Sequence, residues 1–312
     1  MTKPGNDKIR QQDARVMRDF ENMFSDWAIV EETDEMAALI CKLRTNERDL
    51  QGQWAKLEPK PATSMLWHLV AGDVDEAQAW YDAPQPLEEL CERALRLRGT
   101  VGAPARTVMR ERARILLHAM GPRRALPQEG ADLLGMWAEA TRLEPHVRLN
   151  VDVARWRTAE DWLPFTGMSR RFIDGPKPLP AGAETARPEN IPALVEDLIA
   201  FVNESGLTPE VTAAHARHLF VYIHPFVDGN GHTSRMLLCD LLMRAGYAAP
   251  TLVSYVDSAK LHRREWSSQL RSVLLGESEA NELVSLQLRT LLEAQARLMG
   301  RLQRISSSTP SY

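Results

Sequence analysis

Apolar side chains recur at spacings of three or four residues over most of the chain, and this spacing is the strongest constraint on its fold. Between residues 13 and 54 the pattern is carried by Val16, Phe20, Met23, Trp27, Val30, Met36, Leu39 and Ile40. Such a period places the apolar residues on one face of a helix, where they can pack into a core. Hydrophobic strands alternating with helices, which a doubly wound α/β fold requires, are absent from the sequence. The sequence therefore predicts an all-α fold.

Local start and stop signals divide this pattern into separate helices. Thr208 followed by Pro209 is a typical helix start, and Pro225 should end that helix at His224. Gly246 should close the helix that follows. With the pattern at residues 13–54, helices are expected over residues 65–80, 87–97, 105–120, 126–142, 191–203, 208–223, 231–245, 258–275 and 279–304.

Residues 150–192 interrupt the helical pattern. The second half of this segment is rich in proline, namely Pro176, Pro178, Pro180, Pro188 and Pro192. Long irregular segments inside compact proteins usually have a functional role. We expect a loop here, with a short β-hairpin near residues 169–174.

The overall composition narrows the class of protein. Hydrophobic residues make up 44% of the chain and charged residues 26%, as in soluble globular proteins. Lys and Arg total 38 against 42 Asp and Glu, a net charge of −4 that argues against nucleic acid as the partner. No run of 18 apolar residues predicts a membrane span, and the first residues lack the apolar core of a Sec signal peptide.

The cysteines indicate the compartment. Cys41, Cys91 and Cys239 are widely spaced and form no CxxC pair, so neither a disulfide framework nor a zinc ribbon is predicted. A reducing, cytoplasmic location fits best, with export by a system other than Sec left open. The leucine-rich face of residues 279–304 is expected to pack inside the protein, and a second copy of the chain is its alternative partner.

The segment HPFVDGNGHTSR, residues 224–235, contains the candidate catalytic and binding residues. Gly229, Asn230 and Gly231 come directly before a predicted helix, so their backbone N–H groups can form an anion-binding nest. The Asn230 amide could donate to the same phosphate. Arg235 lies one turn into the helix and should reach back to it, because helical side chains tilt toward the N-terminus.

Other side chains of this segment suit phosphate transfer. Asp228 could hold Mg²⁺ bridging phosphates, and His224 could act as a general base. His232 and Arg235 share a helix face, and Phe226 is the apolar anchor of the loop. A metal site made from His215, His218, His224 and His232 is disfavoured, because their spacing matches no metal-binding pattern.

HPFVDGNGHTSR resembles the signature HxFx(D/E)GNGRxxR of Fic-domain proteins, and the similarity extends over about residues 160–275. The resemblance implies a helical protein adenylyltransferase that moves AMP from ATP to a Ser, Thr or Tyr hydroxyl of a protein target. It implies His224 as the base, Asp228 as the Mg²⁺ ligand, and Gly229, Asn230, Gly231, His232 and Arg235 as nucleotide-binding residues.

The chain is expected to divide into three parts, of which the first has no assigned role. Residues 1–85 would form a helical accessory region, residues 86–305 the Fic domain and residues 306–312 a disordered tail. Residues 165–185 would form a β-hairpin flap that docks the protein target by strand addition.

His232 stands where the family has its first arginine. A permanently charged, forked donor is replaced by a titratable ring of shorter reach. Other activities therefore stay open: removal of AMP, transfer from UTP, GTP or CDP-choline, or nucleotide binding without turnover by a regulatory protein.

Many Fic proteins carry an inhibitory helix with the pattern (S/T)xxxE(G/N), whose glutamate pairs with the second arginine of the signature. Two partial matches occur here, Thr107 with Glu111 and Ser278 with Glu282. Glu111 is the preferred inhibitory candidate, because it shares a helix face with Thr107 in a predicted helix before the motif. The alternative is that Glu111 belongs to a solvated face together with Arg106, Arg110, Arg112 and Arg114.

Overall fold

The computed structural model describes residues 30–57, 59–72, 74, 86–97, 103–122, 125–141, 156, 185–186, 188–274 and 277–308. Regular structure within these ranges is helical throughout, which confirms the prediction of an all-α chain. The ranges contain no strand. The hairpin and flap expected at residues 165–185 lie outside them except for Thr185, as do the helical pattern before residue 30 and residues 309–312 of the expected tail.

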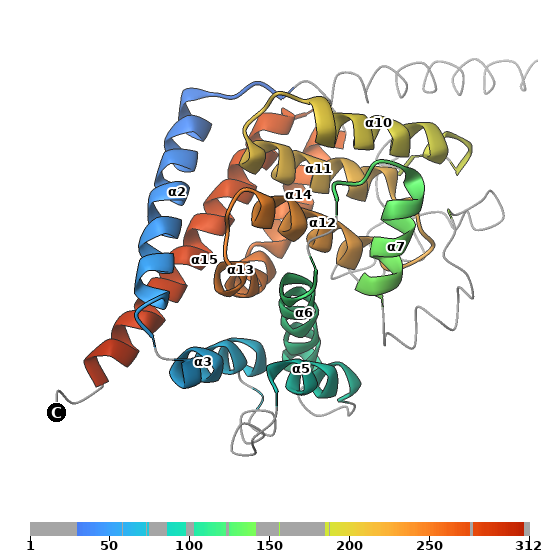
Figure 1. Ribbon diagram of the computed structural model, residues 1–312. Helices are drawn as coiled ribbons and strands as arrows, with labels where there is room; N and C mark the ends of the chain where they lie inside the picture. The colour runs from blue at the N-terminus through green and yellow to red at the C-terminus, as the bar shows by residue number, and fades with distance from the viewer. Residues whose placement is uncertain are drawn as a thin grey trace, which may run out of the picture.

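Two helices joined by a short loop form the centre of the molecule (Figure 1). They are α11 (Pro209–Ile223) and α12 (Asn230–Arg244), and the loop between them carries the start of the predicted motif. Both are buried on nearly every face, so they lie inside the bundle. α10 (Ile191–Glu204) packs on α11, and α7 (Gly130–Ala140) packs on α12.

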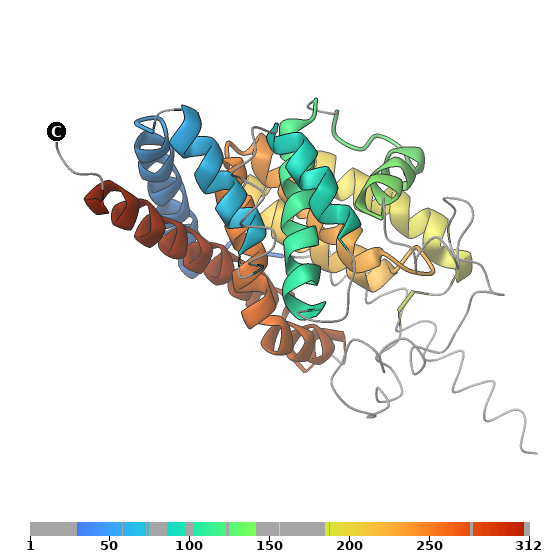
Figure 2. The ribbon, with the colours of Figure 1, turned by 90° about the horizontal axis from the view of Figure 1, so that it is seen from below.

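A second group of helices packs beside this pair. α13 (Ala249–Leu261) lies between α6 (Ala103–Met120) and the long α15 (Ala280–Ser308). α2 (Asp34–Trp54) runs along α15, as both ribbon views show (Figures 1 and 2). The remaining elements are α3 (Pro59–Ala71) and α5 (Leu87–Arg96), which pack on α6, α14 (Arg263–Leu274), and the 3₁₀ turn η3 (Pro188–Asn190).

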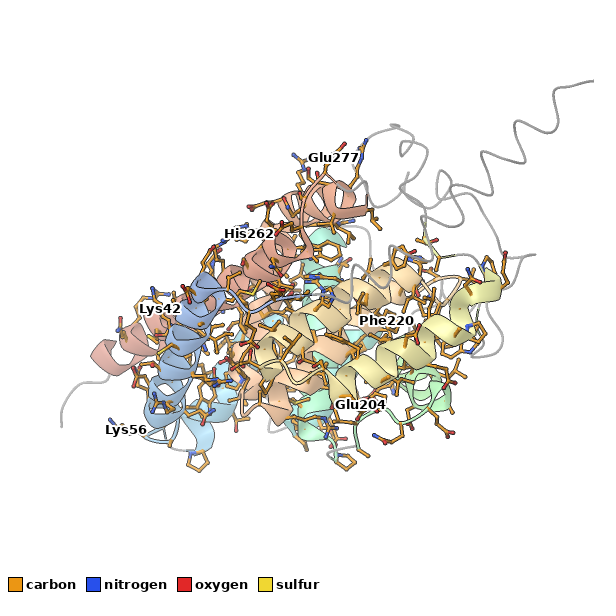
Figure 3. The ribbon with its side chains drawn as sticks, turned by 90° about the horizontal axis from the view of Figure 1, so that it is seen from above. Lys42, Lys56, Glu204, Phe220, His262 and Glu277 are labelled. Atoms are coloured by element: carbon orange, nitrogen blue, oxygen red, sulfur yellow. The ribbon has the colours of Figure 1, made fainter. Side chains whose placement is uncertain are left out.

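The core runs through the whole bundle. Its largest fully buried side chains include Trp67, Phe220, Phe226 and Tyr255. Figure 3 labels Phe220 on α11 in the middle of the molecule, while the exposed Lys42 and Lys56 lie on α2 and in the turn after it. No helix among the described ranges is long and apolar enough to span a membrane.

Two buried carboxylates attach α2 to the centre. Glu210 on α11 accepts from Arg44 Nε and Nη2 on α2, both at 2.8 Å. Glu47 on α2 accepts from Ala248 N at 2.8 Å and Thr251 Oγ1 at 2.8 Å, and thereby caps the first turn of α13. This helix of the expected accessory region, residues 1–85, therefore packs on the same core as α11 and α13.

Several helix boundaries differ from the sequence-based expectation. The helix expected over residues 258–275 is divided between the end of α13, which begins at Ala249, and α14. α3 begins at Pro59 rather than near residue 65, because proline fits the first turn of a helix, where its missing N–H has no partner to lose. α7 begins at Gly130 rather than near residue 126. α15 continues to Ser308, into the segment expected to be a tail.

Candidate functional site

The loop between α11 and α12 begins with a strained residue. His224 adopts the left-handed conformation, with φ 49° and ψ 55°, and is the only non-glycine residue with positive φ in the described part of the chain. Its N–H still donates to Phe220 O at 3.0 Å, and Pro225 prevents the helix from continuing. Such strain costs free energy and persists where the surroundings fix it, often at functional sites.

The Asn230 side chain closes this loop. Its Oδ1 accepts from Phe226 N at 2.9 Å and its Nδ2 donates to Phe226 O at 2.7 Å. The amide is therefore engaged by the loop backbone and is not directed at a phosphate, which corrects one detail of the sequence-based interpretation. The backbone N–H groups of Asn230 and Gly231 remain as donors, since the first N–H groups of a helix have no intrahelical partner.

Helix α7 holds the loop from the other side. Phe226 is 1% exposed and stacks on Trp137 with ring centroids 5.2 Å apart. Trp137 Nε1 also donates to Asp228 O at 2.8 Å. Gly229 has φ 85°, and a Cβ there would lie 2.4 Å from Thr141 Cγ2. The glycine is required both by its conformation and by the close approach of α7.

A backbone contact orients the ring of His224, the residue predicted to act as a base. Its Nδ1 lies 3.4 Å from Val221 O, a contact that favours the tautomer with the proton on Nδ1. Nε2 then carries the lone pair that can accept a proton. The side chain is half-buried at the end of α11.

Asp228 is the one acidic side chain of the loop. Its Oδ1 accepts from Gly229 N at 2.7 Å, which orients the carboxylate. No three His, Cys, Asp or Glu side chains gather into a metal site within the described residues. A single carboxylate suits Mg²⁺, which is usually held by one or two carboxylates together with substrate phosphates and water.

Glu111 of α6 lies directly beside the start of α12. Its Oε1 accepts from Arg235 Nε at 2.6 Å, and its Oε2 lies 2.5 Å from His232 Nδ1. Glu111 is 6% exposed, so the alternative that it belongs to a solvated face is wrong. The structure brings this candidate to the arginine with which an inhibitory glutamate is expected to pair.

The charges of this cluster are set by burial and by the neighbours. Burial favours the neutral acid, but Arg235 and His232 outweigh it and hold the pKa of Glu111 well below its usual range. Burial lowers the pKa of His232, and Arg235 and Arg114 add to this effect against Glu111. At neutral pH an ionised Glu111 therefore accepts a hydrogen bond from a neutral His232.

Glu282, the second inhibitory candidate, lies elsewhere. It is exposed and accepts from Gln269 Nε2 at 2.6 Å. It lines a surface hollow together with Glu35, Glu265 and Glu279, and no residue of the motif lines that hollow.

A comparison with known families identifies part of the chain. Residues 177–242 match the model of the Fic/DOC family, which includes the loop, Arg235 and most of α12. This segment is similar to the Fic/DOC family. The match confirms the resemblance, whereas Glu111 on α6 comes from outside the matched Fic segment.

Curated relatives match the same short region. Proteins named Protein adenylyltransferase Fic from Drosophila virilis and Drosophila persimilis are 60% and 47% identical to the chain, each over 60 residues. These matches cover 19% of this chain and 12% of each relative. The chain thus matches only a small part of these longer proteins.

A solved structure supports the fold over a longer range. A Fic family protein from Desulfovibrio desulfuricans G20 superposes with a TM-score of 0.56, covering 87% of this chain and 76% of that chain. The two sequences are 16% identical, so this similarity concerns the fold alone.

Several residues around the Fic loop were not predicted from the sequence. Trp137 and Thr141 of α7 hold the loop, and nothing in their local sequence indicates that contact. Arg114 was grouped with solvated arginines but is 4% exposed and lies 3.2 Å from Glu111 Oε2 through Nη1. Its position three residues after Glu111, on the same helix face, was the available signal.

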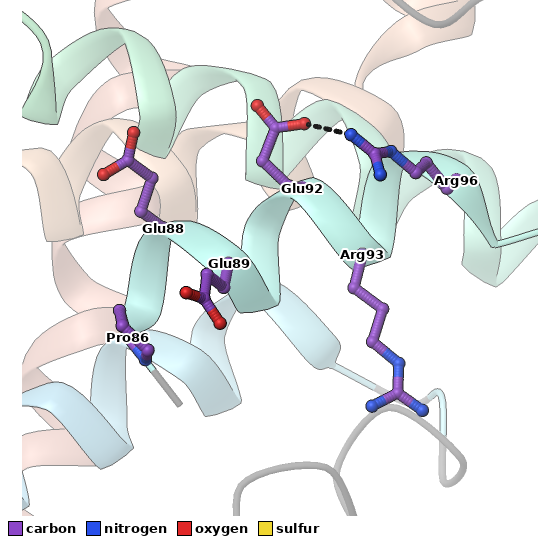
Figure 4. Close-up of a pocket in the computed structure, with 6 residues that line it drawn as sticks. All are labelled: Pro86, Glu88, Glu89, Glu92, Arg93 and Arg96. Atoms are coloured by element: carbon purple, nitrogen blue, oxygen red, sulfur yellow. Dashed lines mark ion pairs between the residues drawn. The ribbon is translucent and has the colours of Figure 1, made fainter. Parts of the chain in front are cut away.

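A surface hollow on another part of the molecule lies away from the Fic loop. It has a volume of about 620 Å³ and is lined by Pro86, Glu88, Glu89, Glu92, Arg93 and Arg96 (Figure 4). Its lining comes from α5 and the residue before it, and Glu92 pairs with Arg96 along the same helix at 3.5 Å. None of the candidate site residues takes part in it.

Proposed function

We propose that the chain is a Fic-type protein adenylyltransferase that transfers AMP from ATP to a Ser, Thr or Tyr hydroxyl of a protein, and that Glu111 inhibits it. The observation that carries the proposal is the arrangement of the loop. His224, with its Nδ1 beside Val221 O, lies at one end, and N–H donors, His232 and Arg235 lie at the other. The name of the Drosophila relatives supports AMP over UMP, GMP or phosphocholine as the transferred group.

The chemistry needs few protein groups. His224 Nε2 would take the proton of the target hydroxyl, whose oxygen would bond to the α-phosphorus as the bond to the bridging oxygen breaks and pyrophosphate leaves. Backbone N–H groups of Asn230 and Gly231 would stabilise the negative charge on the transferring phosphate. Asp228 would hold Mg²⁺, which when bound neutralises phosphate charge.

Glu111 would compete with the substrate. In the structure its carboxylate is bound by Arg235 and His232, the side chains expected to bind a phosphate. Two anions cannot share these donors without repulsion, so ATP would bind productively only after Glu111 leaves. The protein target would dock at the flap predicted at residues 165–185.

The test is intact mass spectrometry of the protein incubated with ATP and Mg²⁺, comparing wild type, E111Q, H224A and E111Q/H224A. We expect E111Q to form an AMP adduct at least about tenfold faster than wild type, because charge-assisted hydrogen bonds that compete with ATP are lost. H224A should lower the rate of E111Q by about 10² to 10⁴, the usual contribution of a general base.

E282Q is the matched control, because it removes the rival carboxylate and should leave the rate unchanged. Activation by E282Q but not by E111Q would contradict the assignment of the inhibitor. An adduct formed with UTP, GTP or CDP-choline but not with ATP would show that this compound, and not ATP, is the donor. ATP binding without an adduct from any donor would indicate a regulatory protein without turnover.

A further inference from the structure

Arg114 is a third basic side chain at the site, and it comes from outside the motif. It lies on α6, three residues after Glu111, and is 4% exposed. Its Nη1 lies 3.2 Å from Glu111 Oε2 and 3.5 Å from His232 Nδ1. Arg235 Nη2 approaches the same His232 nitrogen at 3.2 Å. Two guanidinium groups from different helices therefore flank one imidazole and share one carboxylate.

Among the described residues of this cluster, two guanidinium groups contact one carboxylate. Burial lowers the pKa of Arg114, Glu111 opposes that effect, and the charges of Arg235 and Arg110 add to it. When Glu111 withdraws, Arg114 and Arg235 both lose a carboxylate that they contact. A phosphate that enters the same place would accept charge-assisted hydrogen bonds from both guanidinium groups, so this arrangement favours an incoming anion.

His232 does not supply the positive charge that an arginine would carry at the same position. Burial keeps the imidazole neutral at neutral pH, so it offers one hydrogen bond and no permanent charge. Arg114 lies beside it and carries a planar, permanently charged donor, which suits a phosphate better than the ring does.

We propose that Arg114 is a nucleotide-binding residue, which together with Arg235 holds the terminal phosphate of the nucleotide once Glu111 has withdrawn. This inference rests on the proposed function and deepens it, because it assigns to α6 both the inhibitory carboxylate and one of the cations that it blocks. The competing role is purely structural, in which Arg114 only orients Glu111.

The test measures nucleotide binding without turnover. Calorimetry with magnesium and ATP, ADP or AMP would compare E111Q/H224A with the same protein carrying R114Q. We expect R114Q to weaken ATP binding at least about tenfold, since a charge-assisted contact to the terminal phosphate is lost. Binding of AMP, which lacks that phosphate, should change by less than about twofold, and this also shows that the variant is folded.

R110Q is the matched control. Arg110 lies on the same helix and carries the same charge, but its guanidinium donates to Leu97 O. Its charge reaches Arg114 only at longer range, so R110Q should change the ratio of ATP to AMP affinity by less than about twofold. H232R added to E111Q/H224A/R114Q should restore ATP binding, because it returns a guanidinium to the same place.

The remaining outcomes decide between the two proposals. Equal losses of affinity for ATP and AMP, or no loss for either, would overturn the role of Arg114. If E111Q/R114Q still forms the AMP adduct as fast as E111Q, only the role of Arg114 is overturned and the proposed transferase function is retained. A purely structural role predicts that R114Q affects ATP binding only while Glu111 is present. If E111Q/H224A binds no ATP, both proposals fall.

Discussion

At the scale of single residues, a side chain of a given type can bind a ligand or stabilise the fold, and the sequence alone does not show which of the two it does. The order of Gly229, Asn230 and Gly231 predicts a phosphate-binding loop, and these residues lie in the segment that matches the Fic/DOC family. The direction of the Asn230 amide depends on Phe226, which Trp137 holds in place from a distant part of the chain. A local pattern carries no information on such a contact.

The Asn230 bonds can be tested by an isosteric change. N230D keeps one oxygen for Phe226 N but replaces the amide donor by an oxygen that faces Phe226 O. We expect the free energy of unfolding to fall by about 1–3 kcal/mol, the cost of leaving a buried polar group unsatisfied. Urea denaturation measures this. N190D is the control, because the Asn190 side chain makes no capping bond to α10, and a loss of equal size there would contradict the role of the loop.

At the scale of elements, helices with one polar face were predicted well, as was the buried α11, which begins after Thr208 and ends before Pro225. The first part of α13, which is also buried all round, was missed. α5, α6, α10 and α11 end within about two residues of the expected positions, because their apolar spacing and flanking prolines or glycines are visible in sequence. The first part of α13 was not expected to be helical. Its residues from Pro250 to Val256 are all buried, so they show no alternation of polar and apolar faces, and Val and Thr are poor helix formers.

Two glycines on neighbouring elements should respond oppositely to alanine. At Gly229 the positive φ and the contact with Thr141 oppose a Cβ, so G229A should destabilise the fold by about 1–3 kcal/mol and weaken nucleotide binding. G135A in α7 is the control. Nothing lies within 4 Å of its Cβ position, so it should stabilise by about 0.5–1 kcal/mol. Thermal unfolding of both variants checks this, and a neutral G229A would refute the constraint on the loop.

At the scale of the whole molecule, the site is assembled by helices that lie far apart in sequence. The contiguous residues from His224 to Arg235 could be predicted together because a loop and one helix turn carry them. Glu111 could be proposed only from a partial pattern, and Arg114 not at all, because their roles depend on which face of α6 meets α12. That pairing is decided by the packing of α6 with α3, α5 and α13.

A protonated histidine joins three of these helices. His118 of α6 lies 3.1 Å from Glu139 Oε1 on α7 and 3.4 Å from Asp240 Oδ1 on α12, and Arg244 also pairs with Asp240. Burial opposes the charge, but the two carboxylates outweigh it and raise the pKa of His118 to about 9. The pKa lies near 6.5 in an unfolded chain.

The resulting stability depends on pH in a defined direction. A raised pKa gives stabilisation that is complete below about pH 6.5 and is lost as the pH rises to about 9, up to about 3 kcal/mol. We expect the free energy of unfolding of wild type to decrease over this range and that of H118Q to decrease much less. H68Q, at an exposed histidine of α3, should retain the wild-type dependence. Parallel pH profiles for wild type and H118Q would exclude this stabilising role of the protonated His118.

The carboxylate of Glu111, which we propose to be inhibitory, is part of the same polypeptide as the site that it would block. A tethered competitor keeps its local concentration when the protein is diluted, so dilution would not relieve the inhibition. The apparent affinity for ATP would equal the intrinsic affinity multiplied by the fraction of molecules in which Glu111 has withdrawn. The packing of α6 against α12 would then determine the apparent affinity for ATP, and substitutions in this packing, far from any nucleotide, could change it.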